Sequence, residues 1–295
     1  METEEKVNEE LVSAGKAKRM AWAAADIVLF LVLSMLLAGL LSVPFVAFYP
    51  MFTSEAGKAD VYCQMLNEAL MLAGSLLAAR ALLSFRKIPF KNMGLSLKGG
   101  GRSLWTGALF IVCLYAAGFG ISLLLGAVEV TGIHFSFAAL LISLLFYLLV
   151  AVAEEVMMRG FVLGRLLDGG VHRFVALFLS AVLFSLMHLF NPNFAFLPFI
   201  NITLAGLFLG ASYIYTRNLC FPIALHWFWN WIQGPVLGYN VSGNSFGYET
   251  LLTLRFPEEN LINGGSFGFE GSVLCSLLQV AGIALIIGYY ERRRA

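Results

Sequence analysis

The chain is a series of long apolar runs separated by short breaks rich in glycine, proline, asparagine or charged residues. A helix of about 20 apolar residues crosses the hydrocarbon core of a bilayer. Breaks such as Tyr49-Pro50 and Asn191-Pro192-Asn193 divide the chain at this spacing. The pattern predicts an all-α polytopic membrane helix bundle with about eight transmembrane helices, over residues 21–48, 61–83, 104–125, 137–163, 173–190, 194–215, 221–237 and 272–290.

Composition agrees with an integral membrane protein. Hydrophobic residues make up 59% of the chain and charged residues only 13%, whereas a soluble domain carries about 25% charged residues. The net charge of +1 gives no case for a nucleic-acid partner. The four cysteines are scattered and form no CxxC pair, so they are interpreted as small core residues rather than as disulfides or metal ligands.

The basic residues predict an orientation. With eight spans both termini lie on one side, and that side receives 17 of the 19 lysines and arginines, leaving only Lys58 and Arg255 on the other. Basic residues accumulate on the cytoplasmic side of membrane proteins. Both termini are therefore predicted to be cytoplasmic, and the long acidic loop 238–271 to be extracytoplasmic.

Three segments of the chain are expected. Residues 1–20 are polar and mixed in charge, and are predicted to be a cytoplasmic or interfacial N-terminal segment. Residues 21–290 form a single transmembrane helical domain. The run 21–48 is too long for the apolar region of a signal peptide, so we expect a retained anchor. Residues 291–295 form a basic cytoplasmic tail.

Charges interrupt the run 140–163 at Glu154, Glu155 and Arg159. A charged side chain at the centre of a membrane helix costs at least about 2.5 kcal/mol, so such residues suggest function. Glu155 and Arg159 are four apart and share a helix face, whereas Glu154 points about 100° away. Glu155 is predicted to pair with Arg159 and to leave Glu154 free. A buried ion cluster at the cytoplasmic end of the helix is the alternative.

Two further polar groups fall inside predicted spans. His188 closes the run 173–190, and His226 and Asn230 share one face of the run 221–237. An interfacial histidine and an interhelical hydrogen-bond pair are the structural alternatives. The predicted boundaries put His188 near the extracytoplasmic end of its helix and His226 near the cytoplasmic end of its own. Convergence of the two therefore requires tilted helices or different boundaries.

A carboxylate, two imidazoles and an amide are groups suited to hydrolysis by an activated water. Glu154 can act as a general base assisted by an imidazole, and a second imidazole and the amide can donate to an oxyanion. The same carboxylate and histidines can instead hold a metal, although no HExxH spacing favours zinc. Asp26 is interpreted as interfacial and Glu68 as a packing or cavity residue.

Three motifs carry a family resemblance: Glu154-Glu155-x-x-x-Arg159, Phe184-x-x-x-His188 and His226-x-x-x-Asn230, in this order. Together they resemble the CPBP family, which comprises type II CAAX prenyl endopeptidases and bacterial bacteriocin-processing or immunity relatives, also called Abi proteins. The resemblance covers about residues 140–238 and implies a catalytic core at about 137–238. The first hundred residues match nothing beyond a transmembrane pattern.

The resemblance implies a role for each residue. Glu154 would be the general base with His188 assisting, His226 and Asn230 would form the oxyanion site, and Glu155 and Arg159 would support the first motif. The family has been described both as metalloproteases and as metal-independent glutamate proteases. A divalent metal such as zinc is therefore possible, held by Glu154, His188 and His226.

The expected function is an intramembrane endopeptidase that cleaves a prenylated or membrane-embedded peptide. Its partners would be membrane lipids and that substrate, in the plasma membrane of a prokaryote or the endoplasmic reticulum of a eukaryote. One alternative is a non-catalytic immunity or scaffold protein of the same fold. Another is a proton-coupled transporter that uses Glu154 and the histidines as a relay, although no paired inverted repeats are evident.

Overall fold

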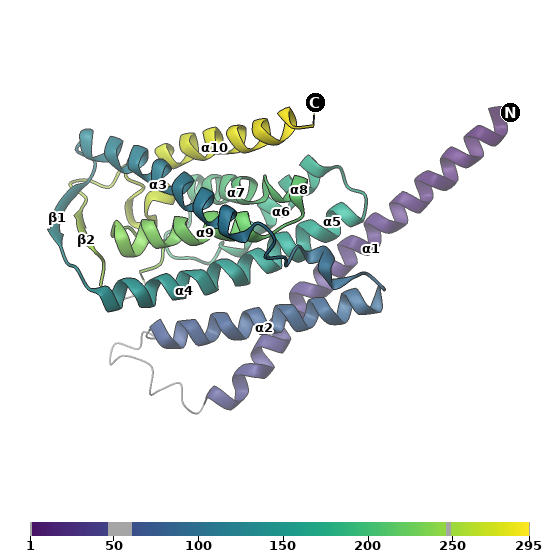
Figure 1. The fold of residues 1–295 in the computed structure, drawn as a ribbon, viewed down its shortest axis with the longest axis horizontal. Coiled ribbons are helices and arrows are strands. Elements are labelled where there is room, and N and C mark those ends of the chain that lie inside the picture. Colours follow the sequence, from purple (N-terminus) through teal and green to yellow (C-terminus); the bar gives the residue numbers. More distant parts are fainter. Residues whose placement is uncertain (1, 47–60, 246–248, 295) are drawn as a thin grey trace.

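The computed structural model describes residues 2–46, 61–245 and 249–294, which form a helix bundle with a two-stranded sheet at one end (Figure 1). The predicted break at Tyr49-Pro50 and the predicted extracytoplasmic Lys58 lie outside the described residues. The main helices are α1 (Glu2–Ser42), α2 (Val61–Phe85), α3 (Gly100–Leu124), α4 (Phe137–Glu155), α6 (Arg173–Met187), α7 (Phe196–Gly210), α9 (Cys220–Trp231) and α10 (Val273–Arg292).

Several helices continue through short irregular turns. α4 runs through a π-helical turn, η3 (Val156–Leu163), into α5 (Gly164–Asp168). α9 runs into a second π-helical turn, η4 (Ile232–Val236), which contains Pro235. The short helix α8 (Tyr213–Thr216) follows α7, and a 3₁₀ turn, η2 (Phe90–Met93), lies between α2 and α3.

All eight predicted spans fall on helices, but the count of eight spans is not confirmed. Within the described residues, six helical segments are long and apolar enough to cross a membrane: Gly15–Val46, Val61–Phe85, Gly100–Leu124, Phe137–Asp168, Phe196–Thr216 and Val273–Arg292. α6 has 15 residues and α9 has 12, which is short of the usual spanning length. The all-α polytopic class is confirmed, and the orientation of the termini stays a prediction.

Small residues allow the helices to approach closely. α1 packs against α2, α6 against α7 and α3 against α9. A Cβ added to Gly206 of α7 would lie 2.6 Å from Ala181 Cα of α6, and one added to Gly74 of α2 would lie 2.7 Å from the Ser34 carbonyl oxygen of α1. Helix interfaces in membranes are built from such small residues because they bring the backbones together.

The predicted extracytoplasmic loop has more structure than its composition suggested. Its strand β2 (Leu252–Arg255) pairs antiparallel with β1 (Glu129–Ile133), and the register shifts at a bulge between Val130 and Gly132. The loop then forms two 3₁₀ turns, η5 (Gly265–Phe267) and η6 (Phe269–Gly271). The amide of Asn201 in α7 donates to the carbonyl oxygens of Glu270 and Ser272, so this part of the loop is bound to the bundle.

A buried ion cluster lies at the end of the bundle opposite the sheet, where α1 meets α5 (Figure 1). Asp26 is 1% exposed, and its carboxylate accepts hydrogen bonds from Arg86, in the turn that follows α2, at 2.7 Å and from Arg165 of α5 at 2.8 Å. Asp168 in turn pairs with Arg217. The sequence predicts Asp26 at the interface, but these contacts bury it between α1, α5 and the turn after α2.

Candidate active site

The first motif lies where α4 gives way to a π-helical turn. Glu154 and Glu155 end α4, and the eight residues of η3 that follow are all buried. π-helical turns are rare and occur frequently at functional sites, because the wider turn redirects side chains. The sequence pattern predicted a helix here but not this change of helical type.

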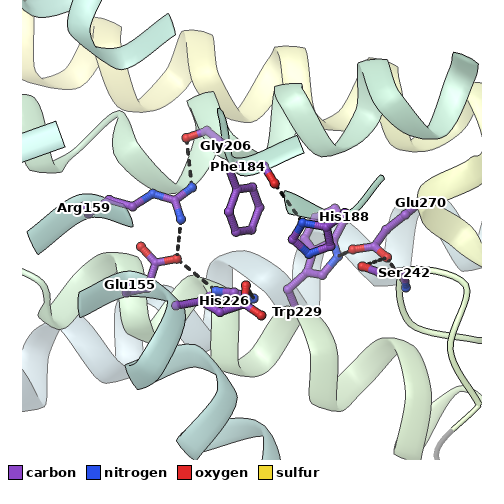
Figure 2. Close-up of polar contacts among 10 residues, drawn as sticks. Glu155, Arg159, Phe184, His188, Gly206, His226, Trp229, Ser242 and Glu270 are labelled. Atoms are coloured by element: carbon purple, nitrogen blue, oxygen red, sulfur yellow. Dashed lines mark hydrogen bonds and ion pairs between the residues drawn. The ribbon is translucent and has the colours of Figure 1, made fainter. Parts of the chain in front are cut away.

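The predicted pairing of Glu155 with Arg159 is confirmed. The Arg159 Nη1 donates to Glu155 Oε1 at 2.7 Å, and the two side chains are 1% and 0% exposed. Arg159 also donates from Nη2 to the Gly206 carbonyl oxygen at 3.1 Å, and its guanidinium lies 4.6 Å from the centroid of the Phe184 ring. Arg159 thus joins the first motif to α6 and α7 (Figure 2).

Glu155 also orients His226. The Nδ1 of His226 lies 2.9 Å from the same Glu155 Oε1 that binds Arg159 (Figure 2). A carboxylate can only accept, so Nδ1 carries the hydrogen and Nε2 is the ring nitrogen left for other partners. Nε2 lies 3.9 Å from Glu154 Oε2, which is longer than a hydrogen bond and short enough for one water to bridge the two atoms.

Glu154 differs from Glu155 in its exposure and in making no hydrogen bond with the described residues, whereas Glu155 binds two partners through Oε1 and leaves only Oε2 without one. Its side chain is 27% exposed, and its Oε2 is buried without a hydrogen-bond partner. Glu154 therefore presents an unpaired carboxylate oxygen next to His226, as its helical position predicted. An unpaired buried acceptor is costly and suggests a role beyond packing.

His188 follows the last residue of α6. Its Nδ1 lies 2.8 Å from the Phe184 carbonyl oxygen, which can only accept, so Nδ1 carries the hydrogen here too. In the neutral ring Nε2 is then an unprotonated acceptor. The ring also packs against Phe184, with centroids 4.7 Å apart, and Phe184 packs against His226 at 6.1 Å.

One cavity collects the predicted residues. It has a volume of about 350 Å³, and its lining includes Glu154, His188, His226 and Asn230. Asn230 is 5% exposed, and its amide has no hydrogen-bond partner among residues 2–46, 61–245 and 249–294. The cavity therefore brings together a carboxylate, two imidazoles and an amide whose polar atoms are free to bind a water and a substrate.

The short helices explain why His188 and His226 converge. α6 ends at Met187 after 15 residues, three residues before the predicted end of the span, and α9 begins at Cys220 with His226 in its middle. The end of α6 therefore meets the middle of α9. The predicted boundaries placed the two histidines toward opposite ends because they assumed two helices of full spanning length.

The loop before α10 lines one side of the cavity, which the sequence did not predict. Glu270, 3% exposed, accepts hydrogen bonds from Trp229 Nε1 at 3.0 Å and from the backbone N–H of Ser242 at 2.6 Å (Figure 2). Asn191 donates to the Ser242 carbonyl oxygen at 3.0 Å. All four residues line the cavity. Glu270 could not be distinguished from the other acidic residues of the loop, because its partners are remote in sequence.

The predicted metal set does not assemble as a metal site. Within the part of the chain that the structure describes, no group of three or more His, Cys, Asp or Glu side chains is placed to hold a metal ion. Glu154, His188 and His226 line one cavity but do not form a three-ligand cluster as they stand.

Comparison with known proteins agrees with the geometry. Residues 135–232 match the model of the family described as Rce1-like, type II CAAX prenyl endopeptidase. This segment contains all three motifs, from Glu154 to Asn230. No curated protein and no solved structure matched the chain.

The fold and the site define a multi-pass helical membrane protein with a polar cavity inside the bundle. The match of its central segment supports a protein of the CAAX protease type in general, as the three motifs suggest. The match supports a hydrolase of this general type, and it does not extend to α1, α2, α3 or α10.

Proposed function

We propose that this protein is an intramembrane endopeptidase that hydrolyses a peptide bond in a prenylated or membrane-embedded peptide. The observation that carries this proposal is the convergence of Glu154, His188, His226 and Asn230 on one cavity. Glu154 Oε2 has no hydrogen-bond partner, and each histidine has its Nδ1 bound and its Nε2 left for a water or a substrate. A scaffold gains nothing from unpaired polar groups inside a membrane bundle, because each costs free energy.

Glu154 is the general base of the proposed reaction. A water between Glu154 Oε2 and the imidazoles gives a proton to the carboxylate as its oxygen attacks the scissile carbonyl carbon. His188 supports this step, because its Nδ1–H is held by the Phe184 carbonyl and its Nε2 is free to accept a hydrogen bond from the same water.

His226 and Asn230 stabilise the negative charge that develops on the carbonyl oxygen. Glu155 accepts from Nδ1 of His226, so a protonated ring offers Nε2–H to the oxyanion and Glu155 balances its charge. The Asn230 side chain offers a second donor. Such donors act mainly in the transition state, so they raise turnover more than substrate binding.

The test is cleavage of a fluorogenic farnesylated CAAX peptide by detergent-purified protein, with wild type, Glu154→Gln and the control Asn67→Ala measured together. Asn67 is an exposed residue of α2. We expect cleavage by wild type and Asn67→Ala only, with the same melting temperature for all three. Parallel reactions with a chelator report on metal dependence.

Two results would contradict the proposal. If the Glu154→Gln variant cleaves the peptide as fast as wild type, Glu154 is not the general base. Failure of wild type to cleave either the farnesylated peptide or an unprenylated transmembrane peptide would favour a non-catalytic scaffold. A proton flux in proteoliposomes that depends on Glu154 would favour a transporter.

A further inference from the structure

Glu68 brings a further carboxyl group to the candidate active site. It lies in α2, outside the segment that matches the protease family, and it lines the same cavity as Glu154, His226 and Asn230. The sequence allowed a packing or a cavity role, and the structure favours the cavity. The mechanism above leaves this residue without a function.

The carboxyl group of Glu68 is unusual among the acidic residues of the helices. Asp26 and Glu155 are each bound by arginine. Glu68 has no hydrogen-bond or ion-pair partner among the residues that the structure describes, although it lies in the interior of a membrane-spanning helix. A carboxyl group kept in such a place without a partner is expensive, so a functional role is the default explanation.

The charges around Glu68 come from the site itself. Glu154 of α4 and His226 of α9 line the same cavity as Glu68. His188 and Glu270 line the same cavity. Outside the cavity, Asp26 of α1 is bound by Arg86, which follows α2, and Arg159 of η3 is bound by Glu155. The guanidinium of Arg80 in α2 lies over the Phe90 ring, 6.0 Å from its centroid.

Two carboxyl groups that face one cavity of low polarity resist ionising together, because like charges repel and burial disfavours each charge. An ionised Glu154 beside a protonated Glu68 supplies a base and an acid in the same cavity. Peptide hydrolysis needs both, since the attacking water loses a proton and the leaving nitrogen gains one.

We propose that Glu68, which lines the same cavity as Glu154, is a further catalytic residue that donates the proton to the leaving nitrogen. This inference rests on the proposed endopeptidase function. The water oxygen bonds to the carbonyl carbon, and a water proton passes to Glu154. The carbon–nitrogen bond then breaks as the Glu68 carboxyl gives its proton to the nitrogen. A proton returns from Glu154 to Glu68 through cavity water, which completes the cycle.

The leaving group provides the sharpest test. The cleaved bond of the farnesylated peptide is first located by mass spectrometry, and a second peptide carries an ester at that bond. An ester leaves as an alkoxide that needs protonation less than an amide nitrogen does. Turnover of both peptides is measured for wild type, Glu68→Gln, Glu154→Gln and Asn67→Ala, with melting temperature and pH dependence recorded for each.

We expect Glu68→Gln to lower amide turnover about 10²-fold or more, with little change in KM, and to lower ester turnover far less. The fall in amide turnover at high pH, where wild type loses its acid, should disappear in this variant. Glu154→Gln should lose turnover of both peptides, because both need the base. Asn67→Ala should behave as wild type.

Other outcomes would overturn the assignment. Equal losses on amide and ester, or a change confined to KM, would make Glu68 a structural or substrate-binding residue. Wild-type activity in Glu68→Gln would remove it from the reaction and leave the proposed function intact, whereas no cleavage by wild type would overturn both. If Glu68→Gln does not fold, the pH dependence of the wild-type protein provides the test. The decrease in turnover at high pH must then be larger for the amide peptide than for the ester peptide, and an equal decrease would overturn the assignment.

Discussion

The bundle contains two buried polar regions that handle charge in opposite ways. In the Asp26 cluster, the carboxylate is 1% exposed and is bound by Arg86 and Arg165, so the charge is matched inside the protein. In the cavity, Glu154 Oε2 has no hydrogen-bond partner, and His188 and His226 each have one nitrogen left for a partner. The first region joins α1 and α5 to the turn after α2, and the second leaves polar atoms facing an open volume of about 350 Å³.

The difference separates two uses of charge in a membrane protein. Buried charges that are fully paired hold helices together, and breaking one pair destabilises the fold. Polar groups left unpaired around a cavity are available to a water or a substrate. Variants in the first region should therefore change stability with little effect on turnover, and variants in the second should do the reverse.

The largest expected effect in this set is that of Asp26→Ala. The change leaves Arg86 and Arg165 without their shared carboxylate, which should cost about 3 kcal/mol of stability. Thermal unfolding in detergent should show a clearly lower melting temperature, while the folded fraction keeps near-normal turnover. Glu258→Ala, at an exposed loop position, is the control. An unchanged melting temperature would show that the cluster is not needed to hold the helices.

Asn230→Ala should have the next largest effect, and it should change turnover rather than stability. Loss of one oxyanion donor should lower turnover about 10²-fold, equivalent to about 2.7 kcal/mol, with a small change in KM. The melting temperature should stay near that of wild type, because the Asn230 amide has no hydrogen bond with the described residues to lose. The measurement is steady-state kinetics with the peptide that wild type cleaves. An effect mainly on KM, with turnover unchanged, would argue against the oxyanion role.

Gly206→Ala tests the packing that supports the site. The added Cβ would lie 2.6 Å from Ala181 Cα, so α6 and α7 must separate, at a cost of about 1–3 kcal/mol. Since Gly206 also accepts from Arg159, both stability and turnover should fall. Gly39→Ala is the matched control, because a Cβ added to Gly39 of α1 would have no atom of the described residues within 4 Å. Equal melting temperatures for the two variants would contradict the close approach.

Glu129→Ala should have the smallest effect. Glu129 pairs with Arg255 between β1 and β2, and these side chains are 43% and 64% exposed. Exposed ion pairs contribute about 0–1 kcal/mol and are weakened by salt. Melting and turnover should both stay within error of wild type. A large effect on turnover would mean that the small sheet communicates with the cavity.

Much of the arrangement could be predicted from local sequence. Apolar runs located the main helices among the described residues, and the spacing of Glu155 and Arg159 predicted their pairing, because a helix places residues four apart on one face. The same geometry predicted that Glu154 would be left unpaired. These features depend on the chain within a few residues of each position.

Other features depend on partners that are remote in sequence. The π-helical turn after Glu155, the shortness of α6 and the binding of Glu270 by Trp229 and Ser242 arise from tertiary packing. A run of apolar residues does not show where a helix stops or changes type. For the same reason the count of eight spans is not confirmed, and Glu68 could not be assigned to the cavity before the fold was known.

The neighbouring residues Glu154 and Glu155 give the most direct test of the central claim, because one carboxylate is unpaired and the other is bound by Arg159 and His226. Turnover and melting temperature should be measured side by side for Glu154→Gln and Glu155→Gln. We predict that Glu154→Gln loses about 10³-fold or more in turnover with unchanged melting, and that Glu155→Gln melts at a distinctly lower temperature as well. Glu154→Gln with normal turnover, or with the same loss of stability as Glu155→Gln, would contradict the claim that Glu154 is kept free for catalysis.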